Sequence, residues 1–307
     1  MQTILGSGGV IGRGLAHELT RFTSNIRLVS RHPQAVNAGD QCVSADLRDA
    51  KQVDAAVAGS SVAYLTVGLR YDIRVWESEW PLVMRNVIDA CRRHGTKLVF
   101  FDNVYVYGLV DGPMTETTPA RPCSRKGEVR GRVAAMLLEE MAAGRMQALI
   151  ARSADFYGPG ATNTFVHPMV FEKLLAGKKA AWLCDDRLPH AMTYTPDAAR
   201  GTALLGNADD GWGEIWHLPT HAEPPTGRQF IEQVAEACGT RPDYQVLRPW
   251  MLKLVALFNP LVRESAEMLY QYTHPYHVDS SRFEARFFAP TSYENGIRET
   301  VAWLRQR

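Results

Sequence analysis

Apolar and polar positions follow a regular rhythm through the first half of the chain. Short runs rich in apolar and β-branched residues predict six strands, at 3–5, 25–30, 41–44, 61–65, 97–101 and 147–151. Between them, apolar residues recur every three or four positions and predict helices at 10–22, up to about 57, at 81–93 and at 126–143. Pro81 is expected to open the third helix and Gly95 to end it. Strands that alternate with helices indicate βαβ units, so the expected fold class is α/β with a doubly wound parallel sheet.

The second half of the chain lacks this rhythm. From about residue 165 onward, prolines interrupt short elements, at Pro189, Pro196, Pro219, Pro224, Pro225, Pro242, Pro249 and Pro260. We expect a first domain over 1–165 and mainly a smaller C-terminal lobe over 166–307, with a return to the sheet around 190–220. The very apolar stretch 250–258 is expected to lie in the core of this lobe, and a partner-facing or lid helix is the alternative. The aromatic and histidine residues over 270–277 either line a substrate pocket or pack the lobe.

Charge balance narrows the class of protein. The 307 residues include 34 Lys and Arg against 33 Asp and Glu, a formal net charge of +1. Such a balance argues against a dedicated nucleic-acid or anionic-membrane binder. No apolar run approaches the roughly 18 residues of a membrane span, and the first residues show no secretion signal. We therefore expect a cytoplasmic protein, monomeric or homodimeric, without nucleic-acid or membrane partners.

Cysteine and histidine spacing points to no metal or disulfide site. The five cysteines are odd in number and scattered, with no C-x-x-C pair. The nine histidines form no H-E-x-x-H motif and no cluster with cysteine. We therefore expect no bound metal, and thiols that stay reduced in the cytoplasm.

A glycine-rich segment joins the first predicted strand to the first predicted helix. Gly6, Gly9 and Gly12 stand at the spacing G-x-x-G-x-x-G. In such a loop the first glycine permits a tight turn, the second lets the backbone approach a pyrophosphate, and the third lets the helix pack on the strand. The helix N-terminus adds free N–H groups and the positive end of a dipole. The motif predicts a Rossmann-type dinucleotide site, with a substrate-binding lobe after it, and the loop residues that contact the cofactor are Gly6, Ser7, Gly8, Gly9, Val10, Ile11 and Gly12.

The end of the second predicted strand bears on the choice of cofactor. NAD sites usually place an Asp or Glu there, on the ribose hydroxyls. Here the strand ends in Ser30, Arg31 and His32, with no acid. A guanidinium suits a 2′-phosphate because it forms bidentate, charge-assisted hydrogen bonds. We therefore expect NADP rather than NAD, with a solvated surface arginine as the alternative for Arg31.

Several segments together resemble one enzyme family. Asp46-Leu47 follows the third predicted strand, and 103–108 (Asn-Val-Tyr-Val-Tyr-Gly) follows the fifth. Residues 152–160 (Arg-Ser-Ala-Asp-Phe-Tyr-Gly-Pro-Gly) follow the sixth, and 290–301 resembles a closing helix. With the glycine loop, these segments resemble the extended short-chain dehydrogenase/reductases, the NAD(P)-dependent epimerase/dehydratase group acting on nucleotide sugars and related substrates.

The resemblance implies further cofactor contacts. Asp46 and Leu47 stand where the family contacts the adenine. The other implied contacts follow predicted strands or open the helix at 126–143, at Val67, Gly68, Asn103, Lys126 and Phe156. The substrate is expected to be a small molecule, with nucleotide-sugar-like compounds among the candidates.

The catalytic positions depart from the family pattern. The family uses Tyr-x-x-x-Lys, in which the tyrosine is the acid/base and the lysine lowers its pKa and holds the nicotinamide ribose. Here Lys126 keeps the lysine position, but Pro122 stands where the tyrosine belongs. Asn103 stands where the family has a Ser or Thr that contacts the substrate oxygen. The chain therefore resembles an atypical branch of the superfamily.

Other groups could supply the missing acid. Tyr105 lies just beyond the fifth strand, at the carboxyl edge where ligands bind, and a phenol beside an ammonium could serve; packing under the cofactor is its alternative. Lys126 contacts the ribose, transfers the proton itself, or is a solvated lysine on the mostly exposed charged face over 125–132. Cys123, beside cations at a helix start, could have a lowered thiol pKa, but no base is evident nearby.

Two functions remain open from the sequence. One is an NADP(H)-dependent oxidoreductase or epimerase-like enzyme with Lys126 and Tyr105 as catalytic candidates. The other is a catalytically silent NADP-binding redox sensor. The lost tyrosine favours the sensor, whereas the retained Lys126, the Gly-Pro-Gly segment and the developed C-terminal lobe favour the enzyme.

Overall fold

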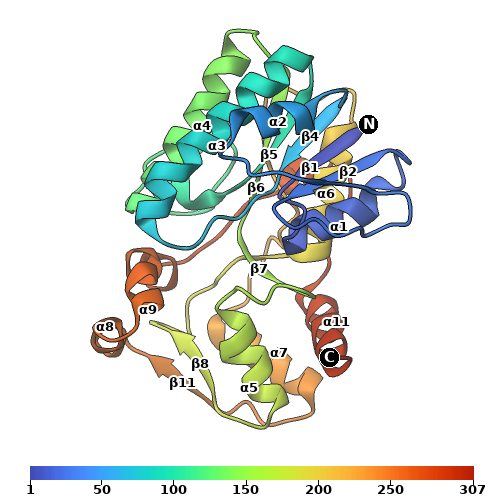
Figure 1. The fold of residues 1–307 in the computed structure, drawn as a ribbon. Coiled ribbons are helices and arrows are strands. Elements are labelled where there is room, and N and C mark those ends of the chain that lie inside the picture. The colour runs from blue at the N-terminus through green and yellow to red at the C-terminus, as the bar shows by residue number, and fades with distance from the viewer. The chain divides into compact units, whose positions relative to one another are not determined.

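The computed structural model describes the backbone of residues 1–307 and all side chains except those of Lys253, Val255, Pro260 and Leu261. The chain forms two compact units (Figure 1). Unit 1 comprises Met1–Val106, Arg125–Ser153 and Ala198–Leu218, and unit 2 comprises Tyr107–Ser124, Ala154–Asp197 and Pro219–Arg307. The expected boundary at 165/166 stays a prediction.

Unit 1 is built on a parallel sheet of seven strands, which confirms the expected α/β fold class. Its strands are β1 (Gln2–Leu5), β2 (Ile26–Ser30), β3 (Gln41–Ser44), β4 (Val62–Leu65), β5 (Lys97–Asn103), β6 (Ala148–Ser153) and β10 (Ile215–His217). They lie in the order β10-β6-β5-β4-β1-β2-β3. The direction of winding reverses between β1 and β4, and ligands of such sheets bind at the carboxyl ends of the strands beside this reversal.

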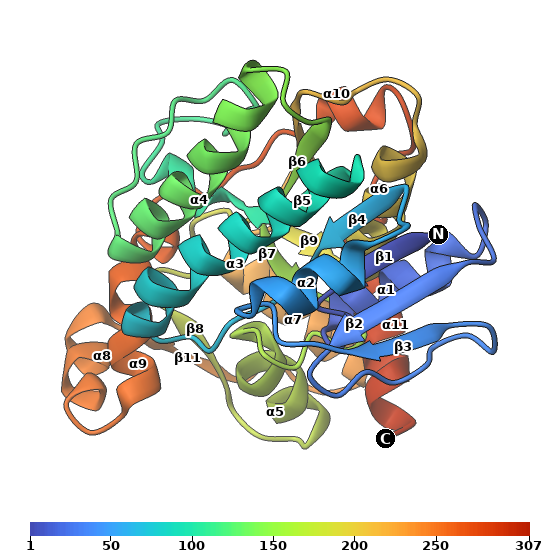
Figure 2. The same cartoon turned by 45° about the horizontal axis from the view of Figure 1, so that its top comes forward.

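Helices cover this sheet. They are α1 (Val10–Leu19), α2 (Ala50–Val57), α3 (Ile73–His94), α4 (Arg125–Ala142) and α6 (Thr195–Asn207). Figure 2 shows α2, α3 and α4 side by side in one layer. Gly14 of α1 lies against Ala199 of α6, since a Cβ on Gly14 would come within 2.8 Å of the Ala199 methyl. Both faces of the strands are therefore buried, as in other doubly wound sheets.

Helix α3 begins earlier than the sequence predicts. It starts at Ile73, where the Asp72 carboxylate accepts a hydrogen bond from the Arg74 backbone N–H at 2.9 Å. Pro81 therefore lies inside the helix and does not open it. Trp76 and Trp80 of the additional turns are buried in the core of unit 1, and this packing outweighs the hydrogen bond that the proline removes.

Unit 2 contains two small parallel sheets. One pairs β7 (Asp155–Tyr157) with β9 (Met192–Tyr194), and the other pairs β8 (Ala180–Leu183) with β11 (Tyr244–Leu247). Around them lie η2 (His167–Phe171), α5 (Glu172–Leu175), α7 (Gly227–Cys238), α8 (Pro249–Ala256), α9 (Pro260–Ser265), η3 (Ala266–Tyr272), α10 (Ser281–Glu284) and α11 (Tyr293–Arg305). The core is aromatic, and Tyr157 stacks on Tyr293 with a centroid distance of 5.2 Å.

The apolar stretch 250–258 departs from expectation. Leu252 is buried in the core of unit 2, but Trp250, Leu254, Leu257 and Phe258 are exposed. Core burial is therefore wrong for these four side chains. Those of Lys253 and Val255 lie outside the described residues.

Of the aromatic residues over 270–277, Tyr272 and Tyr276 pack the interior of unit 2. The buried Tyr272 and Tyr276 stack on the two sides of the His190 ring, at centroid distances of 4.3 and 4.8 Å. Asp155 Oδ2 lies 3.1 Å from His190 Nε2. Among the described residues, no helix is both long enough and apolar enough to cross a membrane.

Candidate functional site

The glycine loop connects β1 to α1 at the carboxyl edge of the sheet. Gly6 has φ +105°, and a Cβ there would lie 2.4 Å from the Val67 backbone. A Cβ on Gly12 would lie 2.7 Å from the Gly6 carbonyl oxygen. Neither distance is tolerable, so the packing of the loop itself requires glycine at these two positions.

Gly8 and Gly9 are glycines for a different reason. A Cβ on Gly8 would meet nothing within 4 Å, and one on Gly9 would meet only the Gly6 carbonyl oxygen, at 3.9 Å. No described part of the chain therefore demands glycine here. Gly9 caps α1 without a side-chain hydrogen bond, so the first-turn N–H groups, including those of Val10 and Ile11, have no partner within the helix. This open surface is suited to a group that must approach the backbone closely.

Two buried hydroxyls next to the loop also lack a partner. Among the described residues, nothing forms a hydrogen bond with Ser7 Oγ or with Ser30 Oγ. The Ser7 backbone N–H donates to the Val29 carbonyl at 3.1 Å, so the loop lies against the end of β2, where Ser30 is the last residue. Buried hydroxyls are normally paired, and these two could serve a bound ligand. The sequence analysis did not single out Ser30.

The end of β4 adjoins the same loop. Val67 contacts Gly6 through its backbone, and the Thr66 N–H donates to the Leu5 carbonyl at 2.9 Å. A Cβ on Gly68 would meet nothing within 4 Å. The structure therefore brings Val67 to the glycine loop and leaves the surface at Gly68 open.

Arg31 directly follows β2, and Asp46 lies two residues after the end of β3. The Arg31 side chain is exposed, and no described residue forms a hydrogen bond or ion pair with its guanidinium. Asp46 is bound by Arg48 through Nε at 2.9 Å and Nη2 at 2.6 Å, which lowers the pKa of the carboxyl to about 2. Arg31 adds a weaker effect in the same direction. Leu47 is buried in the core, and its carbonyl accepts a hydrogen bond from Asn86 at 3.0 Å.

Lys126 lies in the first turn of α4 and is completely buried. Its ammonium stands 4.6 Å from the centroid of the Tyr71 ring, which in turn packs edge-on against Trp76. The solvated lysine considered from the sequence is thus wrong. The sequence prediction of the site did not include Tyr71. Its position in the loop after β4, at the carboxyl edge of the sheet, is the signal that could have identified it as a site residue.

Tyr105 lies in the short helix η1 (Val104–Tyr107) directly after β5. Its backbone N–H donates to Asn103 Oδ1 at 3.1 Å, and its half-buried ring packs against the core of unit 1. Asn103 therefore shapes the turn that places Tyr105.

A buried ion cluster joins β5, α4 and β6. Asp102 accepts hydrogen bonds from Arg130 Nε at 2.7 Å and from Arg152 Nε at 3.1 Å, and all three side chains are buried. The Arg130 guanidinium also lies 4.2 Å from the Trp80 ring centroid. The expectation of a mostly exposed charged face over 125–132 is therefore wrong for Arg130 as well as Lys126. A buried carboxylate needs such partners, and the cluster ties the start of α4 to the end of β5.

Two further candidates lie in unit 2. Phe156 is a half-buried residue of β7. Cys123 is exposed, but partial desolvation of its sulfur raises the pKa of the thiol, in the opposite direction to the lowering that the neighbouring cations could have caused. The structure gives no support for Cys123 as a nucleophile.

The comparisons with known proteins agree with this architecture. Residues 3–216 match the model of the NAD dependent epimerase/dehydratase family. A 3beta-hydroxysteroid-dehydrogenase/decarboxylase isoform of Arabidopsis thaliana is 22% identical over 254 residues; the match covers 77% of the chain and 43% of that protein. The chain thus spans less than half the length of this relative.

Solved structures extend the likeness in fold to nearly the whole chain. A dTDP-glucose 4,6-dehydratase of Streptomyces venezuelae, solved with NAD, has a TM-score of 0.81 at 17% identity and covers 100% of this chain and 98% of its own. A UDP-glucose 4-epimerase of Thermus thermophilus, also solved with NAD, has a TM-score of 0.78 at 21% identity and covers 99% of both chains. The family model covers more than half of the chain and agrees with the glycine loop and the seven-stranded sheet, so the protein belongs to the NAD dependent epimerase/dehydratase family.

Proposed function

We propose that the protein is an NADP(H)-dependent oxidoreductase or epimerase-type enzyme that acts by hydride transfer on a small, nucleotide-sugar-like substrate. The observation that carries this proposal is the division within the glycine loop. Gly6 and Gly12 are required by the chain's own packing, whereas Gly8 and Gly9 face open space beside the unpaired Ser7 hydroxyl. A loop that served only as a turn would need no glycine at the open positions.

The residues of this edge fit a dinucleotide phosphate. The N–H groups of Val10, Ile11 and Gly12 at the start of α1 would hold the pyrophosphate, with the Ser7 hydroxyl as a further donor. Arg31 would bind a 2′-phosphate, because it is exposed and its guanidinium is not engaged by any described residue. The solved relatives named above hold NAD, and the preference for NADP is our proposal for this chain.

Arg31→Asp tests the cofactor preference. The exchange removes the phosphate partner and introduces a carboxylate suited to ribose hydroxyls, so the ratio of NADP to NAD affinity should fall by about tenfold or more. Titration of both dinucleotides by calorimetry measures the ratio. Arg241→Asp, at another exposed arginine, should leave it unchanged, and an unchanged ratio in Arg31→Asp removes this residue from the site.

The chemistry is assigned to Lys126 and a neighbouring phenol. When bound, the nicotinamide supplies or accepts the hydride. We infer that Tyr71 holds the proton that moves to or from the substrate oxygen, because its ring lies next to the buried Lys126 ammonium. A cation beside a phenol stabilises the oxyanion that remains when the proton leaves. Tyr105 is the alternative donor at the same edge of the sheet.

Turnover numbers of single variants distinguish the roles of Tyr71, Tyr105 and Lys126. NADPH oxidation is measured with a panel of carbonyl compounds and nucleotide sugars, followed by kcat for Tyr71→Phe, Tyr105→Phe and Lys126→Met. Tyr71→Phe keeps the ring and should lower kcat by about 10²- to 10⁴-fold, with NADPH affinity nearly unchanged. Lys126→Met should lower both kcat and the affinity for NADPH. A loss in Tyr105→Phe alone would transfer the proton to that phenol.

One observation favours the second function, a silent NADP-binding redox sensor. Pro122 occupies the family's tyrosine position, and no side chain replaces the phenol at that point of the sequence. Tight NADPH binding without oxidation by any compound of the panel would support the sensor and contradict the enzyme.

A further inference from the structure

A row of aromatic rings extends from Tyr71 into the core of unit 1. The ring centroid of Trp76 lies 5.6 Å from that of Tyr71 and 6.3 Å from that of Trp80. Trp80 continues the row to Phe100 of β5, at a centroid distance of 6.4 Å. All three pairs pack edge to face, an arrangement that the quadrupoles of aromatic rings favour. We call these four residues the aromatic row.

One end of the aromatic row is firmly held. Trp80 and Phe100 are buried, and the Arg130 guanidinium lies 4.2 and 4.9 Å from their ring centroids. Arg130 also belongs to the buried ion cluster of unit 1. Trp76, which is buried too, therefore packs on a fixed base. Tyr71, at the other end, is only half-buried, and Trp76 is its link to that base.

Tyr71 and Trp76 lie on the two sides of the start of helix α3. Asp72 caps the helix, so Tyr71 directly precedes the cap and Trp76 is the fourth helical residue. Apolar side chains at these two positions form a hydrophobic staple, a contact that fixes the angle at which the chain enters a helix. Because both side chains here are rings, the staple also fixes the Tyr71 ring in relation to the helix.

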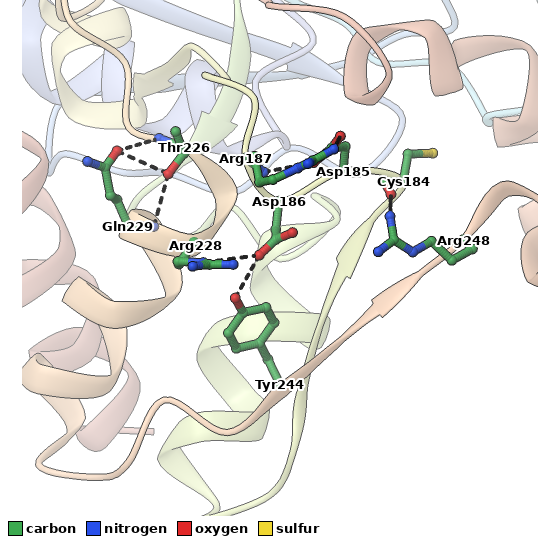
Figure 3. Close-up of polar contacts among 9 residues, drawn as sticks. All are labelled: Cys184, Asp185, Asp186, Arg187, Thr226, Arg228, Gln229, Tyr244 and Arg248. Atoms are coloured by element: carbon green, nitrogen blue, oxygen red, sulfur yellow. Dashed lines mark hydrogen bonds and ion pairs between the residues drawn. The ribbon is translucent and has the colours of Figure 1, made fainter.

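A helix can begin without such an aromatic contact. In unit 2, α7 begins with a capping box, in which Thr226 Oγ1 accepts a hydrogen bond from the Gln229 N–H at 3.3 Å and Gln229 Oε1 accepts one from the Thr226 N–H at 2.9 Å (Figure 3). In α3 the Asp72 carboxylate already serves as a cap. Trp76 Nε1 is buried and has no hydrogen-bond partner among the described residues, a cost that a leucine would avoid. Stability of the helix start therefore does not account for a tryptophan at this position.

We propose that Trp76 is a positioning residue, which holds the Tyr71 phenol beside the Lys126 ammonium. This inference rests on the function proposed above, in which Tyr71 holds the proton that moves to or from the substrate oxygen. The ammonium lies 4.6 Å from the Tyr71 ring centroid, and its stabilisation of the oxyanion weakens as the two groups separate. A displacement of about 1 Å can cost about 10²-fold in rate, so a less firmly held Tyr71 should slow the proton transfer.

A double-mutant cycle tests the proposal, with a substrate identified in the panel described above. Trp76→Met keeps an apolar side chain in the staple but replaces the rigid ring with a flexible chain. It should lower kcat by about tenfold or more and leave NADPH affinity within about twofold. Trp76→Phe, the conservative variant, should keep kcat within about threefold. In the Tyr71→Phe background, Trp76→Met should change kcat by less than about twofold, because the phenol through which Trp76 acts is absent.

Trp212→Met is the matched control. Trp212 also lies in unit 1 and has a lysine ammonium near its ring, that of Lys97 at 5.0 Å from the centroid. This variant should keep kcat within about twofold of the wild type.

The outcomes separate this inference from the function on which it rests. An equal loss of kcat on Trp76→Met in both backgrounds would mean that Trp76 acts on the fold in general, and an unchanged kcat would mean that it does not act on the reaction. Either result overturns the inference, while a loss of kcat in Tyr71→Phe leaves the proposed function standing. If Tyr71→Phe keeps the wild-type kcat, or if the panel yields no substrate, the proposed role of Tyr71 fails and this inference fails with it.

A measurement without substrate guards against a variant that fails to fold. In protein labelled with meta-fluorotyrosine, the fluorine NMR signal of Tyr71 is the one that is missing from Tyr71→Phe. In Trp76→Met this signal should move towards its position in the urea-unfolded protein, and in Trp76→Phe it should move in the same direction by less. Trp212→Met should leave it in place. A signal that keeps its wild-type position in Trp76→Phe and in folded Trp76→Met would overturn the inference.

Discussion

Gly6 and Gly9 belong to one loop, yet they are glycines for opposite reasons. Gly6 has a positive φ and presses against the Val67 backbone, so the fold itself needs it. Gly9 has φ −78° and ψ 166°, which any residue adopts, and its Cβ position is open. The two positions therefore separate folding from ligand binding.

Gly9→Val should keep the fold and lose the cofactor. The side chain would enter space that no described residue occupies, so the melting temperature should stay within a few degrees of the wild type, whereas NADPH affinity should fall by about tenfold or more. Thermal melting and NADPH fluorescence titration measure the two effects. Gly6→Val should instead melt far lower, because its Cβ would clash with backbone. Undiminished NADPH binding by folded Gly9→Val would show that the loop is not a phosphate cradle.

At the scale of elements, a π-helical turn buries a titratable group. His167 opens η2 and is 3% exposed, with its ring edge-on to Trp303. Burial lowers the pKa of the imidazole, and the Glu172 carboxylate, 3.2 Å from Nε2, opposes this only in part. The folded state therefore resists protonation of His167.

This burial should make the protein less stable in mild acid. The unfolded chain takes up the proton at about pH 6.5, whereas folded His167 does so only at lower pH. Below about pH 6.5 the unfolded state thus binds more protons than the folded state. The free energy of unfolding therefore decreases as the pH is lowered, until the pH lies below the lowered pKa of folded His167. In His167→Phe this contribution is absent, so the free energy of unfolding in urea should change less between about pH 7.5 and about pH 5.5. An identical pH dependence in the two proteins would contradict the role of His167.

Helix α3 shows how far an element can be predicted from its own residues. The apolar period and Gly95 predict its end, because both signals are local. The predicted start at Pro81 is wrong. In a sequence pattern a proline is a stronger signal of a helix start than a single aspartate such as Asp72. Burial of Trp76 and Trp80 in the core stabilises the additional turns before Pro81, and that burial exists only in the folded unit.

For the whole molecule, the order of strands was beyond the sequence but its class was not. Alternating strands and helices indicate a parallel sheet, because a crossover connection returns each strand in the same direction. The order β10-β6-β5-β4-β1-β2-β3 follows from which strands pair, over distances in the chain that no local pattern encodes.

The sequence by itself determined the α/β class, the position of the glycine loop, and Arg31 at the end of β2 as a cofactor candidate. These depend on residues a few positions apart, which lie on one strand, one turn or one helix. Only the tertiary structure decided that Tyr71 faces Lys126, that Arg130 is buried on Asp102, and that four large apolar side chains of the stretch 250–258 are exposed. Each of these depends on contacts, or their absence, between segments far apart in the chain, where the packing of whole elements outweighs local preference.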